Sequence, residues 1–269
     1  MLDGVPRFAK LRLGRGFMSE PAAKQRRDEM TNEPAPLNVL MSGGFSAAYE
    51  QLLPEFTRTS GIDVITGSGA SQGTGPQTIA AQLGRGVAAD VVILSREGLT
   101  ELMAAQRIAA GTDVDLAQVP LGVAVRAGTP KPDVSTVEAF KHLLLKAEAI
   151  AMPGSTSGIW LKTDLFPRLG IGEKIIMKMA PRGTDATRMV AAGDVDLAVM
   201  PVSEIMQAAG VDFAGSIAPE IQFVQVFSAA VVAGSARIEA AKRLIAFLAS
   251  ARASEAIRNS GMEPLATSG

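Results

Sequence analysis

Short apolar segments alternate with amphipathic segments from Leu37 onward. Leu37–Met41 and residues 90–94 are almost wholly apolar, which is typical of strands that are covered on both faces. Residues 47–57 instead place apolar side chains at helical spacing. This alternation predicts an α/β fold with parallel strands.

The same pattern predicts further elements. Helices are expected at residues 72–83, 97–105, 235–248 and 253–259, and strands at residues 119–126 and 221–232. Ser135 and Glu138 have the spacing of a capping box, which predicts a helix from Ser135 to Leu145.

A Pro-rich break at residues 128–132 divides the strand–helix units into two sets. We therefore expect two lobes: residues 37–126 with 221–269 form the first, and residues 127–220 form the second. Ligands of open α/β sheets bind beyond the carboxyl ends of the strands, so the two lobes are expected to enclose a ligand cleft.

Five of the predicted strands end in small loops rich in Gly, Ser and Thr, and a helical pattern follows each loop. These loops are residues 42–44, 67–71, 155–158, 182–185 and 201–204. A helix start has unpaired N–H groups and partial positive charge, and small residues let a ligand approach them. Several such loops around one cleft predict a site for a small anion, although each loop alone is also consistent with ordinary helix capping.

The candidate ligand-binding residues come from these loops, with one further arginine. They are Ser42, Gly43, Gly44, Ser68, Gly69, Ala70, Ser71, Arg96, Ser155, Thr156, Ser157, Arg182 and Ser203. Arg96 follows a strand end, and a guanidinium there or at Arg182 favours a carboxylate ligand. Surface pairing of Arg96 with Glu97 or Glu101 is the alternative.

Glu204 is the candidate catalytic residue if the protein is an enzyme. A desolvated carboxylate beside an anion site can move a proton between two carbons. The alternative role for Glu204 is to stabilise the start of a helix. Tyr49 follows the first loop and is expected in the core.

Composition excludes several classes of function. The chain has a net charge of −1, no cysteine, one histidine and 4% aromatic residues. These values argue against nucleic-acid binding, thiolate or histidine metal sites and Ser-His-Asp catalysis. No segment is apolar enough for membrane insertion, and the predicted anion site requires no metal and no cofactor.

Residues 1–36 mix basic and acidic side chains and lack the apolar run of a signal peptide. They predict a disordered, charged extension, too short and too polar for a helix-turn-helix. The sequence as written therefore predicts a cytoplasmic protein, whereas a misassigned start would make it periplasmic. Only an exported protein could serve an ABC importer.

Residues 67–71 and 81–94 resemble the type II periplasmic-binding-protein family, and residues 190–200 and 241–261 fit the same family. The resemblance covers residues 37–264 and includes the molybdate-binding branch, whose first two loops supply serine hydroxyls. It implies such roles for Ser42 and for Ser68 or Ser71.

That branch also uses a tyrosine of the last loop, which residues 201–204 lack. Residues 94–99 and 202–205 look more like an offshoot of the family that includes bacterial aconitate isomerases. The resemblance therefore implies either molybdate-like binding or isomerase chemistry.

Two functions remain open at this point. The main prediction is a protein that binds a small anion, an oxyanion or a di- or tricarboxylate, between its lobes. The alternative is a cofactor-free aconitate isomerase, which shifts a proton between the cis and trans isomers and would use Arg96 as the anion clamp and Glu204 as the base. Anion binding is common to both.

Overall fold

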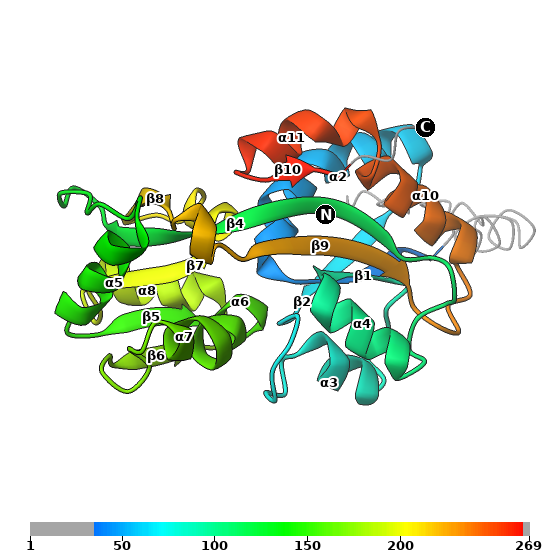
Figure 1. Cartoon of the computed structure of the whole chain (residues 1–269). Helices are drawn as coiled ribbons and strands as arrows, with labels where there is room; N and C mark the ends of the chain where they lie inside the picture. The colour runs from blue at the N-terminus through cyan, green and yellow to red at the C-terminus, as the bar shows by residue number, and fades with distance from the viewer. Residues whose placement is uncertain (1–34, 266–269) are drawn as a thin grey trace, which may run out of the picture. The chain divides into compact units, whose positions relative to one another are not determined.

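The computed structural model describes residues 35–265, which Figure 1 shows as two lobes. In this part of the chain ten strands form one mixed sheet, in the order β2-β1-β3-β9-β4-β7-β5-β6, while β8 and β10 pair with β4. The two-lobed α/β fold predicted from the sequence is thus confirmed. The extension predicted for residues 1–36 lies outside the described residues, except for residues 35 and 36.

The first lobe combines two segments that are far apart in the sequence. Its elements are β1 (Leu37–Met41), η1 (Gly43–Phe45), α2 (Ser46–Ser60), β2 (Val64–Ser68), α3 (Ile79–Gly84), β3 (Val91–Ser95), α4 (Arg96–Ala104), the first part of β4 (Val114–Arg126), β9 (Val224–Val231), α10 (Ile238–Leu248), η4 (Ala251–Ala253), α11 (Ser254–Asn259) and β10 (Glu263–Pro264).

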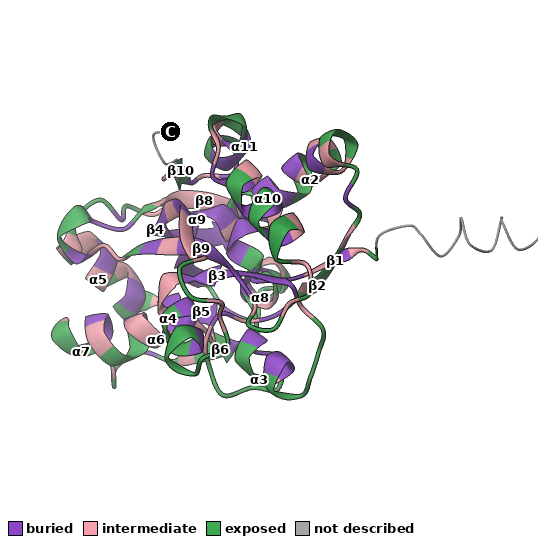
Figure 2. Cartoon of the chain, turned by 90° about the vertical axis from the view of Figure 1, so that its right-hand side faces the viewer, coloured by how far each residue is buried: buried purple, intermediate pink, exposed green. Residues whose placement is uncertain are grey.

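Helices cover both faces of the first-lobe sheet because successive side chains of a strand point to opposite faces. Leu37, Val39 and Met41 of β1 pack in the core cluster that includes α2, α10 and α11, whereas Leu40 packs with α3 and α4. Figure 2 shows the central strands buried and the outer faces of the helices exposed. This packing fixes the carboxyl end of β1, from which site residues extend.

The second lobe is built from the intervening segment. Its elements are the second part of β4, α5 (Val137–Lys146), β5 (Ile150–Pro153), α6 (Thr156–Trp160), η2 (Leu161–Leu165), α7 (Phe166–Arg168), β6 (Met177–Ala180), α8 (Gly183–Ala192), β7 (Leu197–Pro201), α9 (Val202–Ile205), β8 (Val211–Ser216) and η3 (Pro219–Ile221).

In the second lobe, too, successive side chains of a strand point to opposite faces of the sheet, and helices cover both faces. Ile150 and Met152 of β5 pack in the cluster that contains α5, while Ala151 packs in the cluster that contains α8. Small alanines on the α8 side let this helix lie close to the strands, and its N-terminus is thereby held at the end of β6.

The strand β4 belongs to both lobes. Residues 114–120 pair with β9 of the first lobe, and residues 121–125 pair with β7 of the second. The change of sheet therefore falls between Pro120 and Leu121, before the predicted lobe boundary at Arg126. The chain returns to the first lobe through η3 and β9.

Three helix starts differ from the sequence prediction by two residues or more. The helix expected at residues 235–248 begins at Ile238. The helix expected at residues 72–83 begins only at Ile79, because residues 71–77 form turns and Thr78 caps α3 by accepting the Ala81 N–H at 3.2 Å. The cap of α5 is Thr136 rather than Ser135, because Thr136 accepts the Ala139 N–H at 3.1 Å.

Two strand predictions also change. β4 starts five residues earlier than predicted, and the strand predicted at residues 221–232 begins at Val224 because η3 precedes it. Among residues 35–265, no helix combines the length and hydropathy that crossing a lipid bilayer requires.

Candidate functional site

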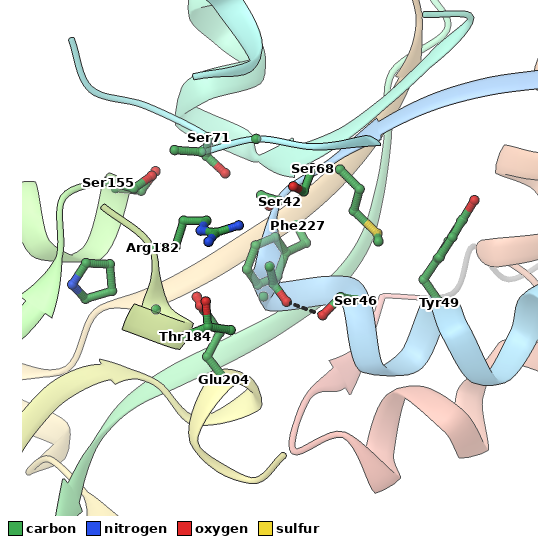
Figure 3. A pocket seen from close by; sticks show the side chains of 18 of the residues that line it. Ser42, Ser46, Tyr49, Ser68, Ser71, Ser155, Arg182, Thr184, Glu204 and Phe227 are labelled. Atoms are coloured by element: carbon green, nitrogen blue, oxygen red, sulfur yellow. Dashed lines mark hydrogen bonds between the residues drawn. The ribbon is translucent and has the colours of Figure 1, made fainter. Parts of the chain in front are cut away.

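A cleft of about 460 Å³ lies where loops of the two lobes meet. The first lobe lines it with the end of β1, η1, the start of α2 and the loop after β2, and the second lobe lines it with the loops after β5 and β6. Glu204 of α9 and two residues of β9 complete the wall. Figure 3 shows hydroxyl groups and Arg182 converging on this space.

Most of the predicted site residues line this cleft. They are Ser42, Gly43, Gly44, Ser68, Gly69, Ala70, Ser71, Ser155, Thr156, Ser157, Arg182 and Glu204. Two predicted residues, Arg96 and Ser203, do not line it.

Arg96 is held away from the cleft by two acidic residues. Its guanidinium Nη1 lies 2.8 Å from Asp113 Oδ2, and its Nε and Nη2 donate to Asp115. Asp115 also accepts the hydroxyl of Ser228, so the arginine charge is bound within a polar network at the start of β4. Arg96 was predicted to bind a ligand carboxylate, with surface pairing to Glu97 or Glu101 as the alternative. The structure places its guanidinium in an ion pair, but with Asp113 and Asp115, and Arg96 does not line the cleft.

Ser203 is buried within α9, and its side chain is 3% exposed. Its Oγ has no hydrogen-bond partner among residues 35–265. The residue therefore lies behind the cleft wall, next to Glu204.

Ser42 is the first-lobe hydroxyl that is most clearly available to a ligand. It is buried and lines the cleft, and within the described chain its Oγ lacks a hydrogen-bond partner. A buried hydroxyl without a partner is unfavourable unless a ligand or water satisfies it. Ser42 is therefore suited to contact a bound anion.

The start of α8 brings a positive charge to the second-lobe side of the cleft. The helix has ten residues and begins at Gly183, and Arg182 is its N-cap. Arg182 points into the cleft (Figure 3), and its Nε lies 3.3 Å from Asp185 Oδ2. Because Arg182 is half exposed and its ion pair is long, its guanidinium can also bind an anion.

The carboxylate of Glu204 lies between glycines of the two lobes. A Cβ atom on Gly43 would be 3.3 Å from Glu204 Oε2, and a Cβ atom on Gly183 would overlap this carboxylate. The absence of side chains at both positions makes room for the acid beside the anion loops.

Burial raises the pKa of Glu204 from 4.5 to about 7. No hydrogen bond or charge within the described residues offsets this desolvation. An acid with such a pKa exchanges its proton near neutral pH, as a general acid or base requires.

This pKa also predicts how stability depends on pH. Because the folded protein binds the Glu204 proton more tightly than the unfolded chain does, the stabilisation is complete below about pH 4.5 and is lost as the pH rises to about 7. Relative to Glu204→Gln, wild type should lose about 3 kcal/mol of unfolding free energy between pH 4.5 and 8. Urea denaturation of both proteins across this range measures the difference, and parallel pH curves would contradict it.

Several residues that line the cleft were not predicted as site residues. Thr184 is one of them and lies in the predicted loop 182–185. Tyr49 is buried in the core as expected, and its hydroxyl lies 3.0 Å from that of Thr66 at one end of the cleft. Gln225 and Phe227 share one face of β9. The signal for Gln225 was its amide within a mostly apolar strand.

The two lobes contact each other beside the cleft. The Gln72 N–H donates to Ser155 Oγ at 3.1 Å, and the hydroxyls of Ser95 and Thr156 lie 2.7 Å apart. Each pair joins a first-lobe loop or strand end to the start of α6.

Comparisons with known proteins agree with this architecture. A family model described as bacterial extracellular solute-binding protein matches residues 37–263. An aconitate isomerase from a Pseudomonas species is 36% identical over 231 residues, which cover 85% of this chain and 88% of that protein.

Solved structures show the same fold at lower identity. The periplasmic molybdate-binding protein of Azotobacter vinelandii has a TM-score of 0.64 at 21% identity, covering 84% of this chain and 98% of that one. The sulfate-binding protein SubI of Mycobacterium tuberculosis has a TM-score of 0.67 at 20% identity, covering 86% of this chain and 88% of that one. The fold is thus that of two-lobed periplasmic binding proteins, and the chain belongs to the family of bacterial extracellular solute-binding proteins.

Proposed function

We propose that the protein is an aconitate isomerase that binds the tricarboxylate between its lobes and needs no cofactor. The observation that carries the proposal is Glu204, a carboxylate with a pKa of about 7 inside a cleft whose loops suit an anion. The 36% identity to an aconitate isomerase over most of both chains supports the same activity.

The proposed reaction moves one proton and one double bond. Aconitate carries a CH2 group and a vinyl CH on either side of the carbon that bears its middle carboxylate. Ionised Glu204 removes a proton from the CH2 group, and the electron pair delocalises over the three carbons and the adjacent carboxylate. Glu204 then returns the proton to the former vinyl carbon, so the double bond re-forms one position away and no atom is gained or lost.

The other cleft residues are assigned to binding. Hydroxyls of Ser42, Ser71 and Ser155, unpaired N–H groups at the start of α8 and the Arg182 guanidinium donate to the substrate carboxylates. These donors also offset the repulsion between an ionised Glu204 and an anionic substrate. In the proposed reaction they would stabilise the negative charge that increases when the proton leaves.

Proton NMR of trans-aconitate in D2O with purified protein tests the proposal. We expect the vinyl signal of cis-aconitate to appear at a rate proportional to protein concentration. Heat-denatured protein is the control. Saturable binding of aconitate without interconversion would contradict the proposal.

A solute receptor is the function that the hydroxyl-rich cleft and the family would otherwise favour. The NMR assay together with a thermal-shift measurement separates it from an isomerase. A receptor should show a thermal shift with molybdate or sulfate and no turnover of aconitate. A ligand at a hundredfold excess over its Kd stabilises a protein by about 2.7 kcal/mol, which a thermal-shift measurement detects. Only in that case would an importer be the expected partner.

A further inference from the structure

Ser95 lies outside the cleft, at the end of β3, and is fully buried. Its Oγ accepts the N–H of Gly98 at 3.2 Å and so caps α4. The same oxygen lies 2.7 Å from Oγ1 of Thr156, a second-lobe residue that lines the cleft. Ser95 thus connects the start of a first-lobe helix to a cleft hydroxyl of the opposite lobe.

The direction of the Ser95–Thr156 hydrogen bond follows from where each proton can go. Thr156 is the one acceptor that the described residues offer to the Ser95 proton. If Thr156 were the donor, the Ser95 proton would be buried without a partner, which is unfavourable. When Ser95 donates, the proton of Thr156 remains available to a group in the cleft.

Two neighbouring cleft hydroxyls are oriented in the same way. Ser71 Oγ accepts the Ser95 N–H at 3.0 Å, and Ser155 Oγ accepts the Gln72 N–H at 3.1 Å. A hydroxyl that accepts an N–H keeps its own proton free to donate. Figure 3 shows Ser71 and Ser155 on the same side of the cleft, so this side offers protons to a ligand.

We propose that Ser95 is a positioning residue for the bound anion. By donating to Thr156 across the lobes, it makes Thr156 present a proton beside those of Ser71 and Ser155, and the three hydroxyls together bind one ionised carboxylate. Hydrogen bonds in such a chain strengthen one another, so loss of Ser95 weakens a contact that Ser95 does not itself make. The proposal rests on the proposed function only in taking a tricarboxylate as the ligand.

Calorimetric titration with tricarballylate tests the coupling, since this saturated tricarboxylate cannot isomerise. Ser95→Ala and Thr156→Val should each raise its Kd about tenfold, the usual effect of one lost hydrogen bond. Because both variants break the same chain, the double variant should be little weaker than either single one. A hundredfold effect of the double variant, or unchanged affinity in the single ones, would overturn the proposal.

Ser95→Ala also removes the cap of α4, so a control must lose a cap elsewhere. Thr136→Ala removes the cap of α5, which is exposed and outside the cleft-lining residues. It should lower the melting temperature and leave the Kd for tricarballylate unchanged. Thr156→Ser keeps the hydroxyl and should retain most of the affinity for tricarballylate. If the threonine acted only through the packing of its methyl group, this variant would lose affinity as Ser95→Ala does.

Turnover distinguishes this proposal from the proposed function. Ser95→Ala should raise the KM for trans-aconitate about tenfold with a much smaller change in kcat, because Glu204 is untouched. Wild type that binds tricarballylate but does not isomerise aconitate would refute the isomerase. The coupling between Ser95 and Thr156 would then be judged from the Kd values of the single and double variants alone. Wild type that binds neither tricarballylate nor molybdate would refute both.

Discussion

Replacement of Glu204 by glutamine is expected to slow the isomerisation of aconitate by orders of magnitude while the protein still binds the tricarboxylate. Removing a general base typically costs about 10²- to 10⁴-fold in rate, and we expect kcat to fall within this range. Glutamine has the size of glutamate, so the glycines at positions 43 and 183 accommodate it without a new contact. NMR turnover and calorimetric titration with tricarballylate provide the two measurements.

Glu50→Gln is the matched control for the loss of a negative charge. Glu50 also lines the cleft, but its side chain is exposed. Its replacement should change turnover little and should favour anion binding slightly at low salt. Equal loss of activity in the two variants would show that charge near the cleft, rather than proton transfer by Glu204, is what matters.

The pH dependence of wild type provides an independent check. The base must be ionised, so kcat/KM should rise with pH until it levels off above the Glu204 pKa of about 7. Activity that is already maximal at pH 5 would assign the proton transfer to another group.

Gly183→Ala is expected to have the second-largest effect. A Cβ atom at this position would overlap the Glu204 carboxylate and lie 2.8 Å from Cε of Met200. The acid must therefore turn away from its position, and we expect a fall in kcat of about 10²-fold, in line with the cost of a misplaced catalytic group. Overpacking of this kind also lowers the unfolding free energy by about 1–3 kcal/mol.

Two further variants show whether this effect comes from the clash. Gly84→Ala places a methyl group at the end of α3. Apart from its chain neighbours and the backbone of its own helix, none of residues 35–265 has an atom within 4 Å of this group, so activity should be unchanged. In a Glu204→Ala background, Gly183→Ala should be far less destabilising, because the carboxylate it would meet is gone. A penalty of the same size in both backgrounds would locate the strain at Met200 instead.

Periodicity was sufficient to predict the alternation of strands and helices, and Gly, Ser and Thr after the strands marked the loops that line the cleft. Strands such as β1 are recognisable because both of their faces are apolar, and the small residues after them mark the helix starts. Helix boundaries were less predictable, because Ser135 and Thr136 both have the chemistry of a cap and only the path of the chain decides between them. β8 lacks a buried apolar run and was not predicted.

Arg96 shows that the binding partner of a charged side chain cannot be predicted from its position after a strand. A guanidinium after a strand end can reach into a cleft, yet Asp113 and Asp115 lie at the start of β4 and bind it first. Those acids are 17 and 19 residues away, so local sequence does not reveal the pairing. Gln225 was missed for a related reason, since its place in the cleft depends on how β9 lies beside β4.

The position of β9 between β3 and β4 has a consequence for synthesis of the chain. The first-lobe sheet remains interrupted until residues 224–231 have been made, although its first strand begins at Leu37. All strands of the second lobe lie between residues 121 and 216, so they can assemble earlier on the ribosome. The second lobe is thus the first that can be completed, although its synthesis begins later. The first lobe cannot be completed until β9, near the carboxyl end of the chain, has been synthesised.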